Sequence, residues 1–171
     1  MKNFELGIKD IGLITSFPLC KEMTSEDVKI FIRHLVGMQY ESDEVIFKQG
    51  QQTNDNLYII LTGKVAITTK LEEFDNNDFA IGIQEKGDVT GILSFIDGRP
   101  HKASAKASTP VNMAIVSRQD YQHFKDFHPS IAANMLQYLI ISADNLACKL
   151  LQQLSESQAY MYGLTSNKGK H

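Results

Sequence analysis

The sequence predicts a mainly β domain with flanking helices, arranged as a sandwich or jelly-roll barrel and followed by a long C-terminal helix. Three observations lead to this prediction. Between residues 38 and 116, short runs of β-branched and aromatic residues alternate with turn residues. No segment between these runs suits a helical crossover, as a parallel sheet would require. After residue 117 the pattern becomes helical and ends in an apolar repeat with heptad spacing.

Composition limits the classes of protein to consider. The chain has 171 residues, 43% of them hydrophobic, which suits one globular domain with its own core. The net charge of −3 predicts no overall attraction to nucleic acid or to an anionic membrane. No apolar run approaches the ~20 residues of a membrane span, and the first residues lack the apolar block of a signal peptide. We therefore expect a cytoplasmic protein without a membrane partner.

The cysteines fit this location. Cys20 and Cys148 lie far apart and form no CxxC motif. We expect two buried or half-buried thiols in a reducing cytosol.

Residues 1–37 are predicted to form an N-terminal helical segment. Thr24 or Ser25 is placed to cap a helix that has acidic residues in its first turn. An apolar stretch follows, and Gly37 is the expected end of this helix.

Residues 38–117 are predicted to form the β-rich part. The expected strands are the apolar runs 45–47, 57–61, 65–69, 79–83 and 111–116, with a polar stretch at 72–78. Gly50 and Gly63 follow two of these runs and suit turns that need a positive φ. Because 57–61 is apolar throughout, alternation does not tell which of its side chains face inward.

Residues 118–162 are predicted to be helical again, followed by a polar tail at 163–171. A short helix is expected at 118–127, because His128 and Pro129 interrupt the pattern. Ser130 is expected to cap the next helix, which extends to about Gln158. Its apolar residues recur at intervals of three and four, as in a dimer seam. The predicted seam consists of Leu136, Leu139, Ala143, Leu146 and Leu150.

Two segments carry a resemblance to a known family. The first comprises residues 44–50 and 56–65, in which two strands each lead into a glycine turn. The second is 87–105, with the sequence GDVTGILSFIDGRPHKASA. Together they resemble the cyclic-nucleotide-binding domain family, which includes catabolite-activator-type regulators and kinase regulatory subunits. The resemblance implies a β-roll, also called a double-stranded β-helix or jelly roll, and identifies 87–105 with the phosphate-binding cassette.

The framework of the cassette matches the family. Gly91 falls on its leading glycine, and Leu93 and Phe95 fall on its apolar anchors. Gly98 and Pro100 lie in its turn. The cassette-like residues that the resemblance assigns to a ligand are Gly91, Ile92, Leu93, Ser94, His101, Lys102, Ala103 and Ser104, of which Ala103 and Ser104 match the family's small-hydroxyl pair.

Two positions depart from the family. Ile92 stands where the resemblance implies a ribose-binding glutamate, and His101 stands where it implies a phosphate-binding arginine, with Lys102 beside it. An isoleucine accepts no hydrogen bond from a hydroxyl, and a neutral histidine does not replace a guanidinium. We therefore expect much weakened affinity for cyclic AMP, with Ile92 simply filling the pocket.

The basic residues near the cassette leave two interpretations open. Arg99, His101, Lys102 and Lys106 either meet a small anion other than a cyclic mononucleotide, such as a cyclic dinucleotide, or form a solvated surface. His101 by itself is expected to lie in a surface turn.

No catalytic or metal site is predicted. The histidines form no HxH pair, no GxSxG motif occurs, and Ser94 has no candidate base nearby in the sequence. Too few residues follow the long helix for a helix-turn-helix, so direct DNA binding is not expected.

The sequence thus predicts a non-catalytic sensor or regulatory domain with altered ligand specificity, which signals through its C-terminal helix. It is expected to form a homodimer through that helix and to need no cofactor. Three alternatives stay open: a protein-interaction scaffold with a collapsed pocket, an effector-domain fragment of a transcription regulator, and a monomer whose seam packs on its own barrel.

Overall fold

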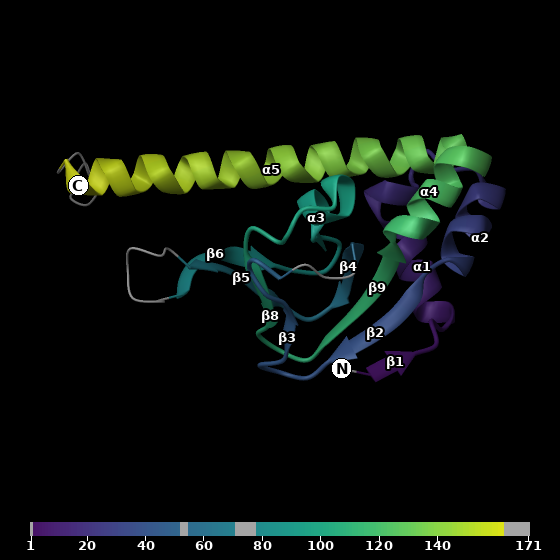
Figure 1. Ribbon diagram of the computed structural model, residues 1–171, viewed down its shortest axis with the longest axis horizontal. Helices are drawn as coiled ribbons and strands as arrows, with labels where there is room; N and C mark the ends of the chain where they lie inside the picture. The colour runs from purple at the N-terminus through teal and green to yellow at the C-terminus, as the bar shows by residue number, and fades with distance from the viewer. Residues whose placement is uncertain (1, 52–54, 71–77, 163–171) are drawn as a thin grey trace, which may run out of the picture.

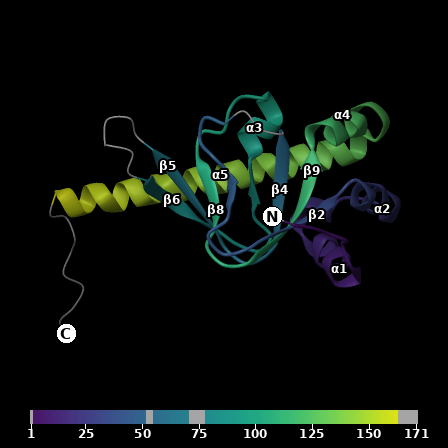
Figure 2. The same cartoon turned by 60° about the horizontal axis from the view of Figure 1, so that its bottom comes forward.

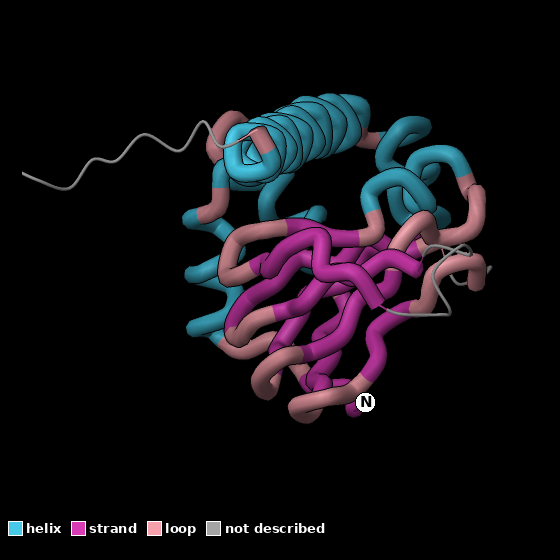
Figure 3. Tube along the Cα trace, turned by 90° about the vertical axis from the view of Figure 1, so that its left-hand side faces the viewer, coloured by secondary structure: helices cyan, strands magenta, loops and turns pink. Residues whose placement is uncertain are grey.

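The computed structural model of the protein describes residues 2–51, 55–70 and 78–162. The polar tail predicted at 163–171 lies outside these ranges, as does nearly all of the polar stretch predicted at 72–78. Two antiparallel sheets face each other, and helices lie along one side of the pair (Figure 1). Viewed from the end in Figure 3, the long helix lies above the strands. The predicted β-roll with a long C-terminal helix is therefore confirmed.

The strands form two sheets of different order. In one sheet the order is β1 (Lys2–Phe4), β2 (Val36–Tyr40), β9 (Val111–Ser117), β4 (Asn56–Thr62) and β7 (Val89–Thr90). In the other the order is β3 (Val45–Phe47), β8 (Ser104–Ala107), β5 (Val65–Lys70) and β6 (Asp78–Gln84). All five predicted runs are strands, whereas β1, β2, β7 and β8 were not predicted as strands.

Strand β4 is buried on both of its faces, which explains why its sequence shows no alternation. Leu57, Ile59 and Leu61 belong to the core cluster that the helices cover. Tyr58 and Ile60 belong to the second cluster, which lies between the two sheets. Because a strand alternates its side chains between faces, a central strand covered on both sides becomes a continuous apolar run.

The N-terminal segment is only partly helical. It contains α1 (Ile8–Ser16), the 3₁₀ helix η1 (Pro18–Cys20) and α2 (Ser25–Arg33). Thr24 is the cap of α2, because its hydroxyl oxygen accepts a hydrogen bond from the backbone N–H of Asp27 at 3.1 Å. The prediction that residues 1–37 are helical is wrong at both ends, where β1 and the start of β2 pair as strands.

Gly37 does not end the helix, which already stops at Arg33. It lies in β2, where a Cβ atom would come within 2.5 Å of the carbonyl oxygen of Phe4 in β1. The glycine therefore permits the close approach of two strands, a long-range requirement that its sequence neighbours do not reveal.

Two helices complete the chain, α4 (Arg118–Phe127) and α5 (Pro129–Met161). The predicted cap of α5 is wrong: His128 occupies the cap position and Pro129 is the first helical residue. Ser130 lies inside the helix, where its hydroxyl donates to the Asp27 carboxylate at 3.3 Å and joins α5 to α2. None of the helices that the structure describes is long and apolar enough to cross a membrane.

Helix α5 packs on the domain through its first third and then extends along the sheets and past them (Figures 1 and 2). Its buried residues are Ile131, Ala132, Met135 and Leu139. The exposed thiol of Cys148 lies farther along the helix, so the expectation that both cysteines are at least half-buried is wrong for this one; Cys20 is buried.

Candidate ligand-binding pocket

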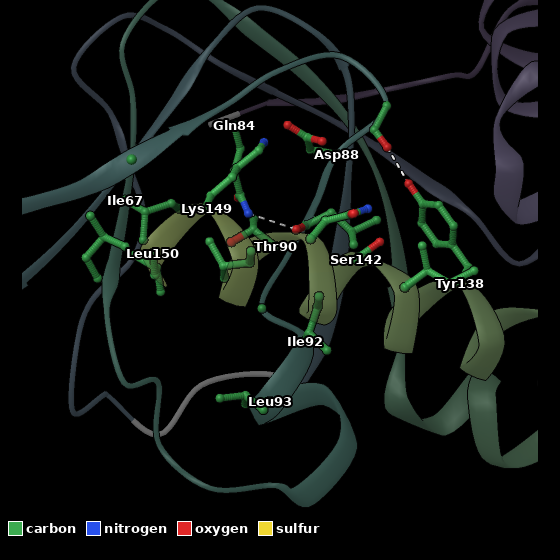
Figure 4. Close-up of a pocket in the computed structure, with 18 of the residues that line it drawn as sticks. Ile67, Gln84, Asp88, Thr90, Ile92, Leu93, Tyr138, Ser142, Lys149 and Leu150 are labelled. Atoms are coloured by element: carbon green, nitrogen blue, oxygen red, sulfur yellow. Dashed lines mark hydrogen bonds between the residues drawn. The ribbon is translucent and has the colours of Figure 1, made fainter. Parts of the chain in front are cut away.

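An open cavity of about 1330 Å³ lies between the β-roll and α5. Strands β5 to β7 supply one wall, the cassette-like segment supplies a second, and the face of α5 that includes Tyr138, Ser142 and Leu150 supplies a third (Figure 4). Of the predicted ligand-binding residues, Gly91, Ile92, Leu93, Ser94, His101, Lys102 and Ala103 line this cavity. Its volume is above the ~300–1,000 Å³ that is typical of small-molecule sites.

The cassette-like segment is positioned by the turn into its short helix, α3 (Ile92–Asp97). Gly91 precedes α3 with a φ of 84°, and a Cβ atom there would lie 2.8 Å from the carbonyl oxygen of Asn56 in β4. A side chain at this position would meet both backbone strain and the adjacent strand. The glycine thus lets α3 begin directly against the sheet.

Arg118 holds the other end of α3. Its guanidinium donates to the carbonyl oxygen of Ile96 at 3.2 Å and pairs with the Asp55 carboxylate at 3.4 Å. Since Arg118 is the first residue of α4, the cassette is tied to the C-terminal helices at this point.

His101 is buried, so the prediction that it lies in a surface turn is wrong. Only 4% of its surface is exposed, and its ring stacks on Phe47 with ring centres 3.9 Å apart. Its carbonyl oxygen accepts a hydrogen bond from Gly50 N at 2.8 Å, which fixes the loop beside the first glycine turn. Burial lowers the pKa of His101 below its ordinary value, so the ring is neutral at pH 7.

Ser94 and His101 form a pair that the sequence did not indicate. The Ser94 hydroxyl lies 2.9 Å from Nδ1 of His101, so the fold places beside this serine a base that no sequence motif indicated. The other ring nitrogen, Nε2, has no hydrogen-bond partner among the described residues. Because no carboxylate or carbonyl in the described part of the chain orients the ring from that side, the pair has no third group of a nucleophilic triad there.

The four basic residues near the cassette have different surroundings. Arg99 pairs with Asp97 at 2.6 Å, and Lys106 pairs with Asp43 at 2.6 Å. His101 is buried and neutral, which leaves exposed Lys102 beside the cavity. Arg99, Lys102 and Lys106 are thus solvated, as the second interpretation expects, whereas His101 is not.

Two other predicted ligand residues have different roles. Leu93, expected to anchor the cassette, is 62% exposed and lines the cavity, whereas Phe95 is fully buried. Ser104 begins β8, where its hydroxyl oxygen accepts a hydrogen bond from Gln49 N at 3.0 Å and so joins β8 to the turn after β3. Ile92 is half-buried at the cavity wall rather than filling its interior.

Sequence reasoning missed cavity residues that come from distant elements. Gln84 lies at the end of β6 and donates its amide N–H to Val89 O at 3.1 Å. Tyr138 of α5 donates its hydroxyl to the carbonyl oxygen of Gly87, the first residue of the cassette-like segment (Figure 4). Neither residue belongs to a recognisable motif, because it is the passage of α5 over the roll that brings both to one cavity.

A family comparison agrees with this geometry. The model described as "Cyclic nucleotide-binding domain" matches residues 38–126. The chain belongs to the cyclic nucleotide-binding domain family.

Relatives of this cyclic nucleotide-binding domain are regulators. The CRP-like cAMP-activated global transcriptional regulators of two Mycobacterium tuberculosis strains, CDC 1551 / Oshkosh and ATCC 25618 / H37Rv, are 27% identical to it over 107 residues. The match covers 63% of this chain and 46% of each regulator, so the chain spans about half the length of the curated relatives it matches.

Solved structures show the same fold. A cyclic nucleotide-binding domain from Methylobacillus flagellatus KT has a TM-score of 0.66 and 23% identity, covering 94% of this chain and 85% of that one. A regulatory subunit of a cAMP-independent protein kinase A from Trypanosoma cruzi, bound to guanosine, also has a TM-score of 0.66, with 21% identity, and covers 87% of this chain and 50% of that one.

Two side chains in the pocket of this cyclic nucleotide-binding domain differ from those that the family resemblance implies. The half-buried Ile92 offers no acceptor to a hydroxyl, and the neutral His101 offers no charge to a phosphate. The nearby guanidinium groups of Arg99 and Arg118 are already paired with carboxylates.

Burial of His101 predicts a pH dependence of stability. Because its pKa in the folded protein is below the ordinary 6.5, the unfolded chain takes up this proton first as the pH falls. The stability that the neutral ring contributes is therefore complete above about pH 6.5 and decreases as the pH falls through that value towards the lower pKa of the folded state. Urea unfolding of wild type and His101→Phe between pH 7 and pH 5 should show a weaker pH dependence for the variant. An equal pH dependence of the unfolding free energy in the two proteins would contradict the conclusion that His101 is buried in its neutral form.

Proposed function

We propose that the chain is a non-catalytic regulatory domain whose pocket senses a small ligand other than cyclic AMP and reports it through α5. The observation that carries this proposal is the pair of replacements at the cavity wall: Ile92 and a buried, neutral His101 stand where the family resemblance implies a glutamate and an arginine. The regulators named above support the non-catalytic role.

The shape of the pocket favours a sensor over a scaffold with a collapsed pocket. The cavity of about 1330 Å³ is open, and Ile92 lies at its wall. The guanosine-bound trypanosomal neighbour further supports a ligand without a phosphate.

Helix α5 is well placed to report occupancy. It supplies one wall of the cavity, and Tyr138 links it directly to the carbonyl of Gly87, the first residue of the cassette-like segment. A ligand that contacts both the roll and α5 would favour one arrangement of the two, which is how differential affinity shifts a two-state equilibrium. The same cavity therefore serves as sensor and transmitter.

Cyclic AMP at ~100 µM should change the melting temperature by less than about 1 °C. A micromolar ligand at this concentration would add about 2.7 kcal/mol, or about 5 °C or more for a domain of this size. Differential scanning fluorimetry measures the shift, and a rise of about 5 °C would show that the proposal is wrong.

The double variant Ile92→Glu with His101→Arg is the matching gain-of-binding test. It restores the carboxylate and the guanidinium that the family resemblance implies, while Gly91 and the α3 backbone stay in place. We expect cyclic AMP to raise its melting temperature by several degrees. If the double variant folds but cyclic AMP does not raise its melting temperature, the two replacements do not explain the expected weak binding of cyclic AMP.

We also infer that two copies pair through α5. Beyond Leu139, every described residue of this helix is exposed or half-exposed, yet the surface carries a row of large apolar side chains, and such patches mark interaction sites. The predicted seam needs revision, because Leu139 is buried in its own domain and Leu146, seven residues later, lies on the same face of the helix. Exposed residues with spacings of four and three form the revised seam, namely Leu136, Ile140, Ala143, Ala147, Leu150 and Leu154, of which Leu150 also lines the cavity.

This pattern favours a second copy of the chain as the partner of α5. A seam of alternating three- and four-residue spacing fits an identical helix, and small residues at Ala143 and Ala147 allow two backbones to approach. Two-fold pairing would also place the two cavities beside the shared helices, since Leu150 belongs to both the seam and the cavity wall.

A further inference from the structure

Three histidines meet at the end of the molecule where α2, α4 and the start of α5 lie (Figure 1). His34 is the cap residue at the C-terminus of α2, His123 lies within α4, and His128 immediately precedes α5. The ring centres of His34 and His123 are 5.4 Å apart, and those of His123 and His128 are 5.8 Å apart. None of the three lines the cavity between the roll and α5.

The ring of His34 is held in place from two sides. Its Nδ1 lies 2.9 Å from the carbonyl oxygen of Ile30, so in the neutral ring this nitrogen carries the hydrogen and donates it. The ring also makes an edge contact with the fully buried Phe124, with ring centres 4.8 Å apart. The other nitrogen, Nε2, is therefore a lone-pair donor in a fixed orientation. Metal-binding histidines typically have this arrangement, in which the second ring nitrogen donates to a backbone carbonyl.

His123 supplies a second ring nitrogen close enough to reach the same ion. Its side chain is exposed, so its ring can turn about the Cβ–Cγ bond. An imidazole nitrogen lies about 2.0–2.1 Å from a bound zinc ion, which places two ring centres on one ion roughly 5–6 Å apart. The observed 5.4 Å between the ring centres of His34 and His123 falls in this range.

The ligand atoms determine the class of ion. Imidazole nitrogens suit zinc, nickel and copper, whereas magnesium and calcium prefer oxygen ligands. No group of three or more metal-binding side chains occurs within the ranges that the structure describes. An ion held by two histidines would therefore complete its coordination with water.

We propose that His34 and His123 chelate one divalent transition-metal ion between α2 and α4. The inference is independent of the proposed function, because neither histidine lines the ligand cavity. The ion joins the end of α2 to the helix that leads into α5. Since the unfolded chain does not hold the two rings together, binding should stabilise the folded domain.

The test is isothermal titration of the full, untagged chain with zinc chloride and with nickel chloride. Each ion should bind one-to-one with a Kd below ~100 µM, and magnesium chloride should not bind. Saturating zinc should also raise the melting temperature by several degrees. The exposed thiol of Cys148 and the imidazole of His171 are competing ligands, so the titrations are repeated in the double variant Cys148→Ser with His171→Asn, which should bind as wild type does.

Two further variants, made in that double-variant background, test the assigned pair. His34→Gln and His123→Gln each remove one imidazole and should weaken zinc binding at least about tenfold. Because His123 is exposed, its replacement should leave the metal-free melting temperature unchanged. The matched control combines His123→Gln with Gln122→His, which turns the imidazole by about 100° around α4 and should not restore binding.

The inference is wrong if neither zinc nor nickel binds at ~1 mM, or if binding disappears in the double-variant background. It is also wrong if His123→Gln binds as wild type does, and this variant decides the question should His34→Gln fail to fold. Loss of binding in His128→Gln with full binding in His34→Gln would place the ion between α4 and α5 and overturn the assignment to α2. All of these outcomes are separable from the cyclic AMP melting test, which bears on the cavity alone.

Discussion

Replacing Leu139 with glutamate should unfold the domain, whereas the same replacement at Ile140 should leave it folded but monomeric. The two residues are neighbours on α5 and differ sharply in exposure, which is 2% for Leu139 and 66% for Ile140. Leu139 belongs to the core cluster that also includes Phe31 and Phe124. Ile140 belongs to the revised dimer seam and touches neither the core cluster nor the cavity wall.

The expected magnitudes follow from these surroundings. Truncating a buried leucine alone costs about 2–5 kcal/mol, and a carboxylate left in the core adds its own desolvation cost. The total approaches the 5–15 kcal/mol that holds a typical domain together. At Ile140 the charge is solvated in the monomer but faces its own copy in a two-fold seam, so it should weaken association about a hundredfold or more.

Circular dichroism and light scattering distinguish the two outcomes. Leu139→Glu should be unfolded at 25 °C, or its melting temperature should lie far below that of wild type. Ile140→Glu should retain the wild-type spectrum and scatter as a monomer while wild type scatters as a dimer. A monomeric wild type at ~100 µM would refute the dimer inference, and a folded Leu139→Glu would contradict the packing of α5.

Substituting Gly63 with alanine should destabilise the domain by about 2–5 kcal/mol, the sum of a left-handed backbone cost and local overpacking. Gly63 connects β4 to β5 with a φ of 87°. A Cβ atom would lie 2.3 Å from Pro110 O and 2.9 Å from Val111 Cγ2, so the chain before β9 would have to move. The carbonyl oxygen of Pro110 belongs to the backbone, so it cannot move aside as the end of a flexible side chain can.

Gly50→Ala is the matched control. Gly50 has a similar φ of 73°, but no heavy atom lies within 4 Å of the added Cβ. The stability of this variant should decrease only by the conformational cost of the left-handed backbone, about 1–2 kcal/mol. Chemical denaturation of both variants measures the difference, and equal destabilisation would mean that contact with Pro110 does not matter.

The extent of sequence prediction differs between fold and site. Turn glycines and apolar runs placed five strands and the two C-terminal helices, because these signals depend on neighbouring residues. The strands β1 and β8 were not predicted, because their sequences, KNF and SAKA, carry weak strand signals. Both strands form through hydrogen bonds to strands that are distant in the sequence. At the site, the cassette was found through family resemblance, whereas Gln84 and Tyr138 were not.

From the sequence alone, the β-roll and its long C-terminal helix could be predicted, and the family resemblance placed Ile92 and His101 where an acid and an arginine are expected. The burial of His101, its hydrogen bond to Ser94 and its stacking on Phe47 became visible in the three-dimensional structure, as did the inward-facing Leu139 and the outward-facing Ile140. The difference arises because periodicity reports which residues share a face of one element. Which face is covered, and whether a polar atom there finds a partner, depends on elements that pack against it from far along the chain.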